Sequence, residues 1–521
     1  MRRPHFAPAV LALAPVVAGG AGCVFDGLGW NETVIDVPQI FQTPVNTDDR
    51  LSDKHPAFDA SRTVVERFND CTVTLNKSGS ITKLDVVGFT GDASALQDEL
   101  FHGYVDALPM LTSREILPSM EVVEAALKPF DDGLYAAVEL AADDGSSGSP
   151  VSKRALFDAV LRQLVTTATT GVASERPYAR EAAAQVAAAI ELSGETPSAP
   201  SDLLSTAAGL ISRFDSDPLS SRPIGFYTWS APLSNIFRRD RFLQSHASVA
   251  PTFGAQAATA HAIDGSGQVA TYSQVLQLYA GITDQYFHRP ISDLLPGASA
   301  SGAFDTLSVL QSSFATAHPE TTLVPSCAAH LAVLPPSESP DERIFRQMFC
   351  SDESALPPNL LDVLVNLIRA GQVDLTPQAA SGWASRQLWA LQTLLAPDTA
   401  PEKDNLFLTA GYKQKLIDTF KTIVTENRET HAKQDEIGGG EGTSAELVPS
   451  DVWPLLPVEP FPSYYLRTAR AYSFVRTLLG SVMGATFLDT AHRLQEDGTV
   501  NAQTLDAELS SVIVRMYGLY E

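Results

Sequence analysis

The densest group of reactive side chains in the sequence is the stretch TENRETHAKQ, residues 425–434. It offers carboxylates, a guanidinium, an imidazole, an ammonium and an amide, carried by Glu426, Arg428, Glu429, His431, Lys433 and Gln434. Paired carboxylates can act as general acid and general base when burial separates their pKa values. The stretch is therefore a candidate pocket for hydrolysis or elimination on a glycan or a peptide.

Helical periodicity divides this stretch between two faces. Apolar residues recur at steps of three and four across residues 412–424, which predicts a helix with one buried stripe. Asn427 and His431 continue that stripe, whereas Glu429 and Lys433 form an i,i+4 pair elsewhere. Buried polar groups need hydrogen-bond partners. Asn427 and His431 therefore belong either to a structural hydrogen-bond network or to the lining of a pocket.

A second polar segment, RPIGFYTWSAPLSNIFRRDRFL, covers residues 222–243 and combines aromatic rings with Arg238, Arg239 and Arg241. Rings beside guanidiniums can hold a sugar or a peptide by stacking and by bidentate hydrogen bonds. The alternative is that the apolar side chains, Phe226 among them, form core and that the arginines are solvated or ion-paired.

Motifs of known chemistry are missing from the sequence. It contains no HExxH, GxSxG, GxxxxGK[ST] or GxGxxG pattern, and no CxxC or Cys/His cluster indicates zinc. Asp284, His288 and Asp293 lie close together, but no second histidine follows at i+4, which favours a satisfied surface histidine over a metal ligand. We expect no metal and no cofactor.

The N-terminal residues are typical of an export signal. Arg2 and Arg3 precede a short apolar run, and GGAGC ends at Cys23, as in a bacterial lipobox. Gly20 stands where leucine is usual, and a plain signal peptide with a chance cysteine is the alternative. A lipidated Cys23 would anchor the protein to a membrane, facing the periplasm or the cell surface. The net charge of −25 disfavours nucleic acid as a partner.

Three further cysteines follow Cys23. Cys327 and Cys350 could form a disulfide in an exported protein, which would stabilise the fold by roughly 3 kcal/mol. Cys71 would remain unpaired, and we expect it to be buried and inert.

The pattern along the chain predicts a mainly α protein, a multi-helix globular assembly with a small N-terminal β-hairpin. Alternating apolar residues around NKSGS, within residues 71–89, predict the hairpin. Helical periodicity begins near residue 93 and recurs to the end. The expected divisions are a signal peptide (1–22), a lipid-anchored tether (23–55), a hairpin with helices (56–200) and a helical domain (201–521).

Several landmarks occur in order through residues 206–521: RPIGFYTWSAPLSNIFRRDRFL, WASRQLWALQTLLAP, FLTAGYKQKLIDTF, ENRETHAKQ and VEPFPSYYLRTA. This order resembles an uncharacterised family of exported prokaryotic proteins, a domain of unknown function with GHYT, ELRHDT…KQ and VEPxP landmarks. Phe226 replaces the histidine of the first landmark, and the Arg-His-Asp-Thr run is broken here. The resemblance implies site roles for Tyr227, Glu426, Arg428, Lys433 and Gln434 more than for His431, and it brings no established activity.

Two functions of different classes remain open. The first is a non-catalytic, lipid-anchored protein of the cell envelope that binds an envelope protein or polymer. The second is an envelope hydrolase or lyase that uses Glu426 or Glu429 with Arg428 and Tyr227. The second predicts that these side chains meet in one cleft.

Overall fold

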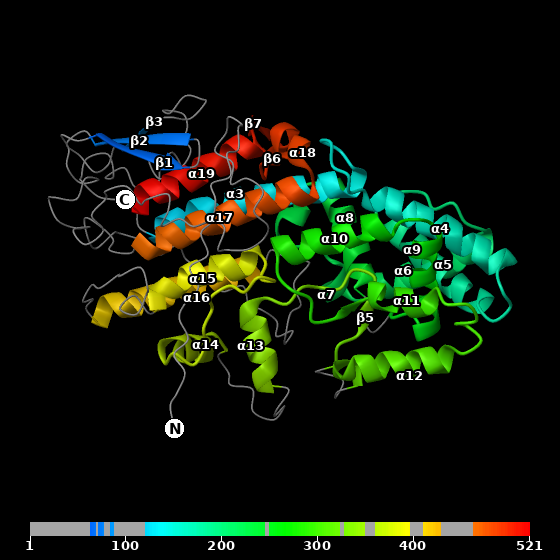
Figure 1. Ribbon diagram of the computed structural model, residues 1–521. Coiled ribbons are helices and arrows are strands. Elements are labelled where there is room, and N and C mark those ends of the chain that lie inside the picture. The colour runs from blue at the N-terminus through cyan, green and yellow to red at the C-terminus, as the bar shows by residue number, and fades with distance from the viewer. Residues whose placement is uncertain are drawn as a thin grey trace, which may run out of the picture.

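The computed structural model of the protein describes residues 63–68, 71–77, 84–87, 120–244, 249–322, 328–349, 360–395, 410–428 and 462–520. Helices dominate these residues, so the predicted mainly α fold class is confirmed (Figure 1). Buried apolar side chains between Met120 and Met516 form one connected hydrophobic core.

A small antiparallel sheet forms at the N-terminal side of the chain. β2 (Cys71–Lys77) pairs with β3 (Leu84–Val87), from Thr74 opposite Val87 to Lys77 opposite Leu84. This pair is the predicted hairpin. β1 (Thr63–Phe68) was not predicted as a strand, and it pairs with the other edge of β2.

The helices of the first half follow one another with short connections. They are α3 (Met120–Asp144), α4 (Lys153–Thr170), α5 (Arg176–Leu192), α6 (Ser201–Asp215), α7 (Pro218–Ser221), η4 (Gly225–Thr228), α8 (Ala231–Leu243), α9 (Phe253–Gly265) and α10 (Val269–Ile282). The chain leaves the helical conformation between Asp144 and Lys153 and between Leu192 and Ser201. Gly145 and Gly148 have φ angles of 76° and 74°, a conformation that glycine adopts without strain.

The second half continues the helical assembly with a few very short strands. Its elements are β4 (Arg289–Pro290), η5 (Ile291–Leu294), α11 (Leu295–Ala298), α12 (Leu307–Ala317), η6 (Pro319–Thr322), β5 (Leu331–Ala332), α13 (Pro340–Phe349), α14 (Leu360–Arg369), α15 (Trp383–Leu395), α16 (Ala410–Arg428), α17 (Pro462–Val482), α18 (Ala485–Thr490), β6 (His492–Leu494), β7 (Val500–Thr504) and α19 (Leu505–Tyr520). β6 and β7 form an antiparallel hairpin that leads into α19.

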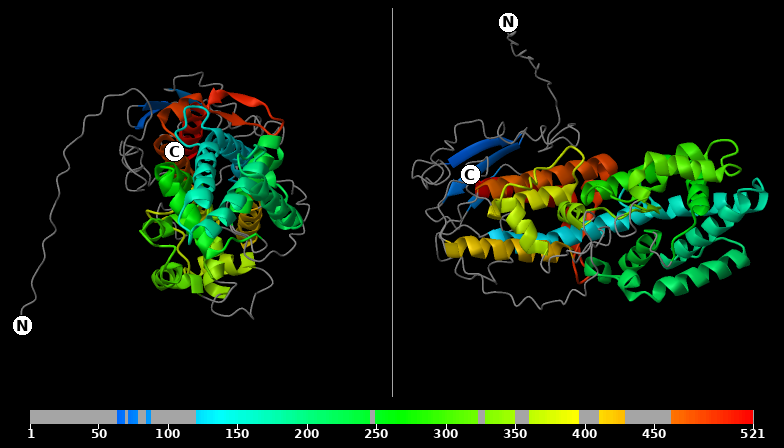
Figure 2. Two further views of the ribbon diagram at one scale, coloured as in Figure 1. Left: turned by 90° about the vertical axis from the view of Figure 1, so that its right-hand side faces the viewer. Right: turned by 90° about the horizontal axis from the view of Figure 1, so that it is seen from below.

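The described helices form an elongated body (Figures 1 and 2). One end contains α15, α16, α17 and α19 with the N-terminal sheet, and the other contains α4, α5, α6, α9, α11 and α12 (Figure 1). Helix α3 runs between the two ends. Its 25 residues span about 37 Å at a rise of 1.5 Å per residue, so one helix carries side chains into both parts.

Helix α5 lies at the centre of the end that contains α4, α6, α9, α11 and α12. Its run from Ala182 to Ile190 is buried on every side, because α4, α6, α8 and α9 all pack against it. Alanine favours the helix and its small side chain allows these neighbours to approach closely. Contacts of α5 with α6, α8 and α9 therefore cross the boundary predicted between residues 200 and 201.

Candidate functional site

Most of the predicted site lies outside the residues whose side chains the structure describes. The helix predicted from the apolar stripe across residues 412–424 is confirmed, because it lies within α16, and Leu416 and Phe420 of that stripe are buried. The side chains of Glu426 and Arg428 are outside the described set, as are Glu429, His431, Lys433 and Gln434 entirely. Cys23, Cys327 and Cys350 also lie outside the described residues. Their roles stay predictions.

Tyr227 is the one predicted site residue whose surroundings can be followed. It lies in η4, only 1% of its side chain surface is exposed, and its hydroxyl donates a hydrogen bond of 2.7 Å to Oε1 of Glu139. The Phe226 ring lies beside the Tyr227 ring, tilted by 30°, with ring centroids 4.2 Å apart. Tyr227 therefore points into the protein, toward a charged group that the sequence analysis did not select.

That group is a buried cluster, here called the Lys153 cluster, formed by Glu139, Lys153, Tyr227, Asp240 and Tyr279. The Nζ atom of Lys153 lies 2.9 Å from Oε2 of Glu139 and 2.7 Å from Oδ2 of Asp240, and it also donates to the Tyr279 hydroxyl. These contacts use all three donors of an ammonium group. Lys153 and Asp240 are 0% exposed.

Glu139 connects the tyrosines to the lysine. Its Oε2 accepts a hydrogen bond of 2.7 Å from the Tyr279 hydroxyl, and its Oε1 accepts the bond from Tyr227. Burial, followed by the negative charge of Glu139, raises the pKa values of Tyr227 and Tyr279 well above the ordinary value for tyrosine. Both phenols therefore stay protonated and act as donors to the carboxylate.

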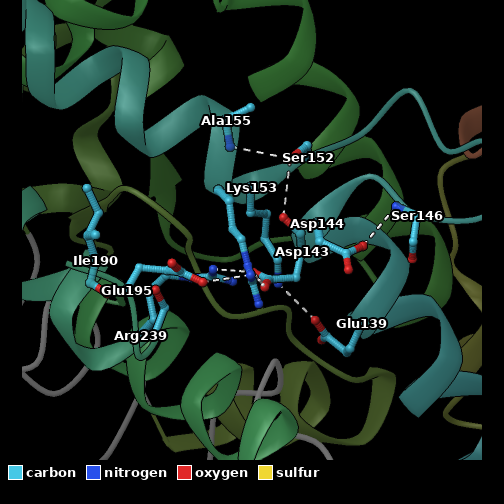
Figure 3. Close-up of polar contacts among 12 residues, drawn as sticks. Glu139, Asp143, Asp144, Ser146, Ser152, Lys153, Ala155, Ile190, Glu195 and Arg239 are labelled. Atoms are coloured by element: carbon cyan, nitrogen blue, oxygen red, sulfur yellow. Dashed lines mark hydrogen bonds and ion pairs between the residues drawn. The ribbon is translucent and has the colours of Figure 1, made fainter. Parts of the chain in front are cut away.

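Five elements supply these side chains: α3, α4, η4, α8 and α10. Lys153 is the first residue of α4, after Ser152, whose hydroxyl accepts the Ala155 amide hydrogen as an N-cap. Figure 3 shows Lys153 extending from the start of α4 between Glu139 of α3 and Arg239 of α8. The cluster thus joins helices that are far apart in the sequence.

A second layer of charges surrounds Asp240. Nε of Arg239 donates to Oδ1 of Asp240 at 2.8 Å, and Nε of Arg154 donates to Asp143 at 2.6 Å. Arg239 donates through another nitrogen to Asp143, and both residues are labelled in Figure 3. Burial raises the pKa of the Asp143 carboxyl, but Arg239 and Lys153 outweigh burial and lower it overall. The pKa of Arg239 is raised by Asp240 and Asp143 despite its burial. Asp143 and Arg239 are therefore both charged.

A contrasting buried acid, Asp131, lies further toward the N-terminus of α3. Its Oδ1 accepts a hydrogen bond of 2.5 Å from Tyr472, and its Oδ2 accepts one of 2.7 Å from Nε2 of Gln387. Burial raises the pKa of Asp131 well above its ordinary value, and the charge of Glu124 raises it further. The nearby Lys128 pairs instead with Asp132.

Asp284 and His288 both have hydrogen-bond partners within the protein. Asp284 accepts hydrogen bonds from the backbone N–H groups of Gln285 and Gly382 and from the Ser385 hydroxyl, at the start of α15. His288 is buried rather than at the surface, and its Nδ1 accepts a hydrogen bond of 3.2 Å from the His330 amide. The expected surface position of His288 was wrong.

The aromatic and basic segment forms core and ion pairs, the alternative given above. Phe226 and Phe237 are each 1% exposed, and Arg239 is buried in its ion pairs. Arg238 pairs with Asp215 near the surface, and Arg241 donates to the side chain of Gln244. None of these three guanidiniums needs a sugar or a peptide as its partner.

The sequence contains a signal for the Lys153 cluster. Two of its three charged members continue an apolar helical stripe: Asp240 follows Leu233, Ile236 and Phe237, and Lys153 precedes Leu156 and Phe157. A lysine at the first position of a helix is also unusual, because the N-terminal end of the dipole disfavours a cation. A charged residue that lies on a buried helix face, or that opposes the helix dipole, indicates that it pairs with a residue distant in the sequence.

Among the described residues, no group of three or more histidine, cysteine, aspartate or glutamate side chains is arranged to hold a metal ion. No helix within the described ranges has the length and apolar character needed to cross a membrane. Comparisons of the chain with protein-family models, with curated proteins and with solved structures gave no match.

Proposed function

We propose that the protein is a lipoprotein of the bacterial cell envelope that binds another envelope protein or a polymer without catalysis. In this proposal residues 1–22 direct export, Cys23 carries the lipid, and the helical body faces the periplasm or the cell surface. The resemblance of residues 206–521 to an uncharacterised exported family is part of the proposal and adds no activity to it.

The observation that carries the non-catalytic part is the position of Tyr227. An acid–base site needs its groups within hydrogen-bond reach of a substrate. The Tyr227 hydroxyl is instead 2.7 Å from Glu139, in a cluster whose Lys153 and Asp240 are 0% exposed. These groups hold helices together, which supports a structural or binding role over a hydrolase or lyase that would include Tyr227.

Membrane anchoring is tested by expressing the full chain in a bacterial host and separating membranes from soluble proteins. Wild type is expected in the membrane fraction with incorporated fatty acid, and Cys23→Ser is expected to be soluble and unlabelled. Cys71→Ser is the matched control and should behave as wild type. A Cys23→Ser protein that still carries fatty acid or stays with the membrane would contradict the anchor.

Catalysis is tested by incubating the purified protein with peptidoglycan and with envelope polysaccharide. We expect that no sugar or peptide fragments are released. We also expect that the protein is retained on one of the polymers or on a membrane-protein fraction. Release of fragments by wild type, with loss of that release in Glu426→Gln, would establish the hydrolase or lyase and overturn the non-catalytic proposal.

A further inference from the structure

The Lys153 cluster contains the reactants of an amide bond as well as an ion pair. An ammonium, a carboxylate and a second carboxylate meet without solvent: the Lys153 Nζ is 2.7 Å from Oδ2 of Asp240 and 2.9 Å from Oε2 of Glu139. The relative exposures of the three side chains are 0%, 0% and 2%. Reacting groups held at this separation need no diffusive encounter.

We propose that Lys153 and Asp240 form an intramolecular isopeptide bond, with Glu139 as the group that transfers the protons. The bond would join the first residue of α4 to α8 across 87 positions of the chain. It is a self-modification of the folded protein and does not depend on the proposed membrane anchor or on any binding partner.

The reaction is a condensation that loses one water molecule. Lys153 passes a proton to Glu139 and attacks Cγ of Asp240 as a neutral amine, forming the C–N bond. The Cγ–Oδ2 bond then breaks. The ammonium gives up two of its three protons in all, and Glu139 carries both to Oδ2, which leaves as water. The remaining proton stays on the amide nitrogen, Glu139 ends as a carboxylate, and nothing is oxidised or reduced.

The surrounding groups match the needs of each step. Nε of Arg239 donates to Oδ1 of Asp240 at 2.8 Å, so a positive charge faces the oxygen on which negative charge gathers during attack. Tyr227 and Tyr279 donate to Glu139, at 2.7 Å each, and hold its carboxylate beside Nζ. Glu139 can therefore accept and return a proton without moving away.

The buried position also favours the product. In water an ammonium and a carboxylate are strongly solvated, and their condensation is unfavourable. Inside the protein both ions have lost that solvation, and a neutral amide removes one positive and one negative charge from the interior. Arg239 and Asp143 keep their own pairing, and Glu139 keeps both tyrosine hydrogen bonds. Exclusion of water then protects the bond from hydrolysis.

The bond is tested on the full-length wild-type protein by denaturation, trypsin digestion and mass spectrometry. Trypsin cuts after Arg239 and Arg241, so a cross-linked protein gives a branched peptide in which Lys153 carries the dipeptide Asp240–Arg241, lighter by one water than the sum of its parts. Finding this peptide as the main form of Lys153 is the expected result. Free Lys153 and free Asp240–Arg241 in fully folded protein would overturn the proposal.

Variants separate the reaction from folding. Lys153→Arg keeps a cation between the two carboxylates but has no amine to condense, so it should lack the branched peptide and retain wild-type helicity by circular dichroism. Asp131→Asn changes a different buried acid on α3 and should be cross-linked as wild type is. A loss of cross-linking in Asp131→Asn equal to that in Lys153→Arg would overturn the assignment to this cluster.

Glu139→Gln tests the proton transfer. In a pulse–chase of newly synthesised protein, formation of the branched peptide should slow by about a hundredfold or more, as expected when a general acid–base group is removed. If Glu139→Gln does not fold, the digestion of the wild-type protein still tests whether the bond forms. A Glu139→Gln protein that cross-links at the wild-type rate would overturn the role of Glu139.

Discussion

Helix α3 buries the same kind of side chain at its middle and near its C-terminal end, in opposite electrostatic surroundings. Asp143, near the C-terminal end, meets Arg239 and Arg154, and its pKa is lowered overall. Asp131, at the middle of the helix, meets the neutral donors Tyr472 and Gln387, and burial raises its pKa. Burial penalises the ionised form at both places, so the presence of cations decides which acid is charged.

This difference gives the two sites opposite responses to pH. Asp143 stabilises the fold above the ordinary aspartate pKa, and that contribution is lost as pH falls through its lowered folded-state pKa. Asp131 has a raised pKa, so its site is most stable below the ordinary value and loses stability as pH rises through the raised value. Mild acid should therefore stabilise the Asp131 site, and still lower pH should destabilise the Asp143 site.

The largest expected effect comes from removing a fully buried cation at the Asp143 site. Arg239→Leu removes the guanidinium that Asp143 and Asp240 share and leaves them with one cation each, Arg154 and Lys153. Unfolding in urea should show a loss of about 3–5 kcal/mol. The adjacent Arg238→Leu is the matched control. Arg238 is 30% exposed and pairs with the 45% exposed Asp215, so its removal should change stability little. Equal losses in the two variants would contradict the importance of burial.

A steric change at Gly133, two residues from Asp131, should disturb the middle of α3. At Gly133 an added Cβ would lie 2.2 Å from the carbonyl oxygen of Leu494 in β6, so Gly133→Ala must push β6 away, at a cost of about 1–3 kcal/mol. Gly209, within α6, has nothing within 4 Å of the same position. Gly209→Ala should therefore stabilise its helix by up to about 1 kcal/mol. Thermal unfolding that destabilises both variants alike would contradict the close approach of β6.

The helical conformation of α3 could be predicted from the sequence, but the partners of its buried acids could not. Helical periodicity from about residue 93 predicted helices in this region, and α3 continues to Asp144 through Pro129 and Gly133, two residues that usually end or weaken a helix. Packing of α3 against α4, α8 and β6 stabilises the helix where its local sequence does not favour one. Periodicity could predict the apolar face, because a repeat of 3.6 residues depends on the backbone alone.

The partners of the buried acids could not be predicted in the same way. Glu139 meets Tyr279 across 140 positions and Asp131 meets Tyr472 across 341, and no local pattern encodes such pairings. Tyr227 was selected through a resemblance, but its partner Glu139 was not selected at all. An acid on an apolar stripe indicates burial. Whether a cation or a phenol faces that acid depends on how distant helices pack.

Neutralising Asp131, the acid at the middle of α3, should change stability in the opposite direction from Arg239→Leu. Asp131→Asn keeps an oxygen to accept the Tyr472 hydrogen bond, and the Gln387 amide can turn to accept from the new NH₂ group. Stability at neutral pH should rise on the order of 1–2 kcal/mol, because no ionised group remains to be desolvated. Urea unfolding from pH 4 to pH 7.5 should also lose the part of its pH dependence that Asp131 contributes. A destabilised Asp131→Asn at neutral pH would show that the carboxylate is needed.

The smallest effect, and the finest test of the contrast, is expected for Tyr472→Phe. It removes the donor to Asp131 and leaves the ring packed between Phe130 and Trp383, whose centroids lie 5.8 Å and 5.5 Å away. One hydrogen bond should amount to about 1 kcal/mol. The loss should increase as Asp131 ionises, since a charged acceptor makes the stronger bond, and should not vary with pH in an Asp131→Asn background. A pH-dependent loss that persists in the double variant would place the ionising group elsewhere than at Asp131.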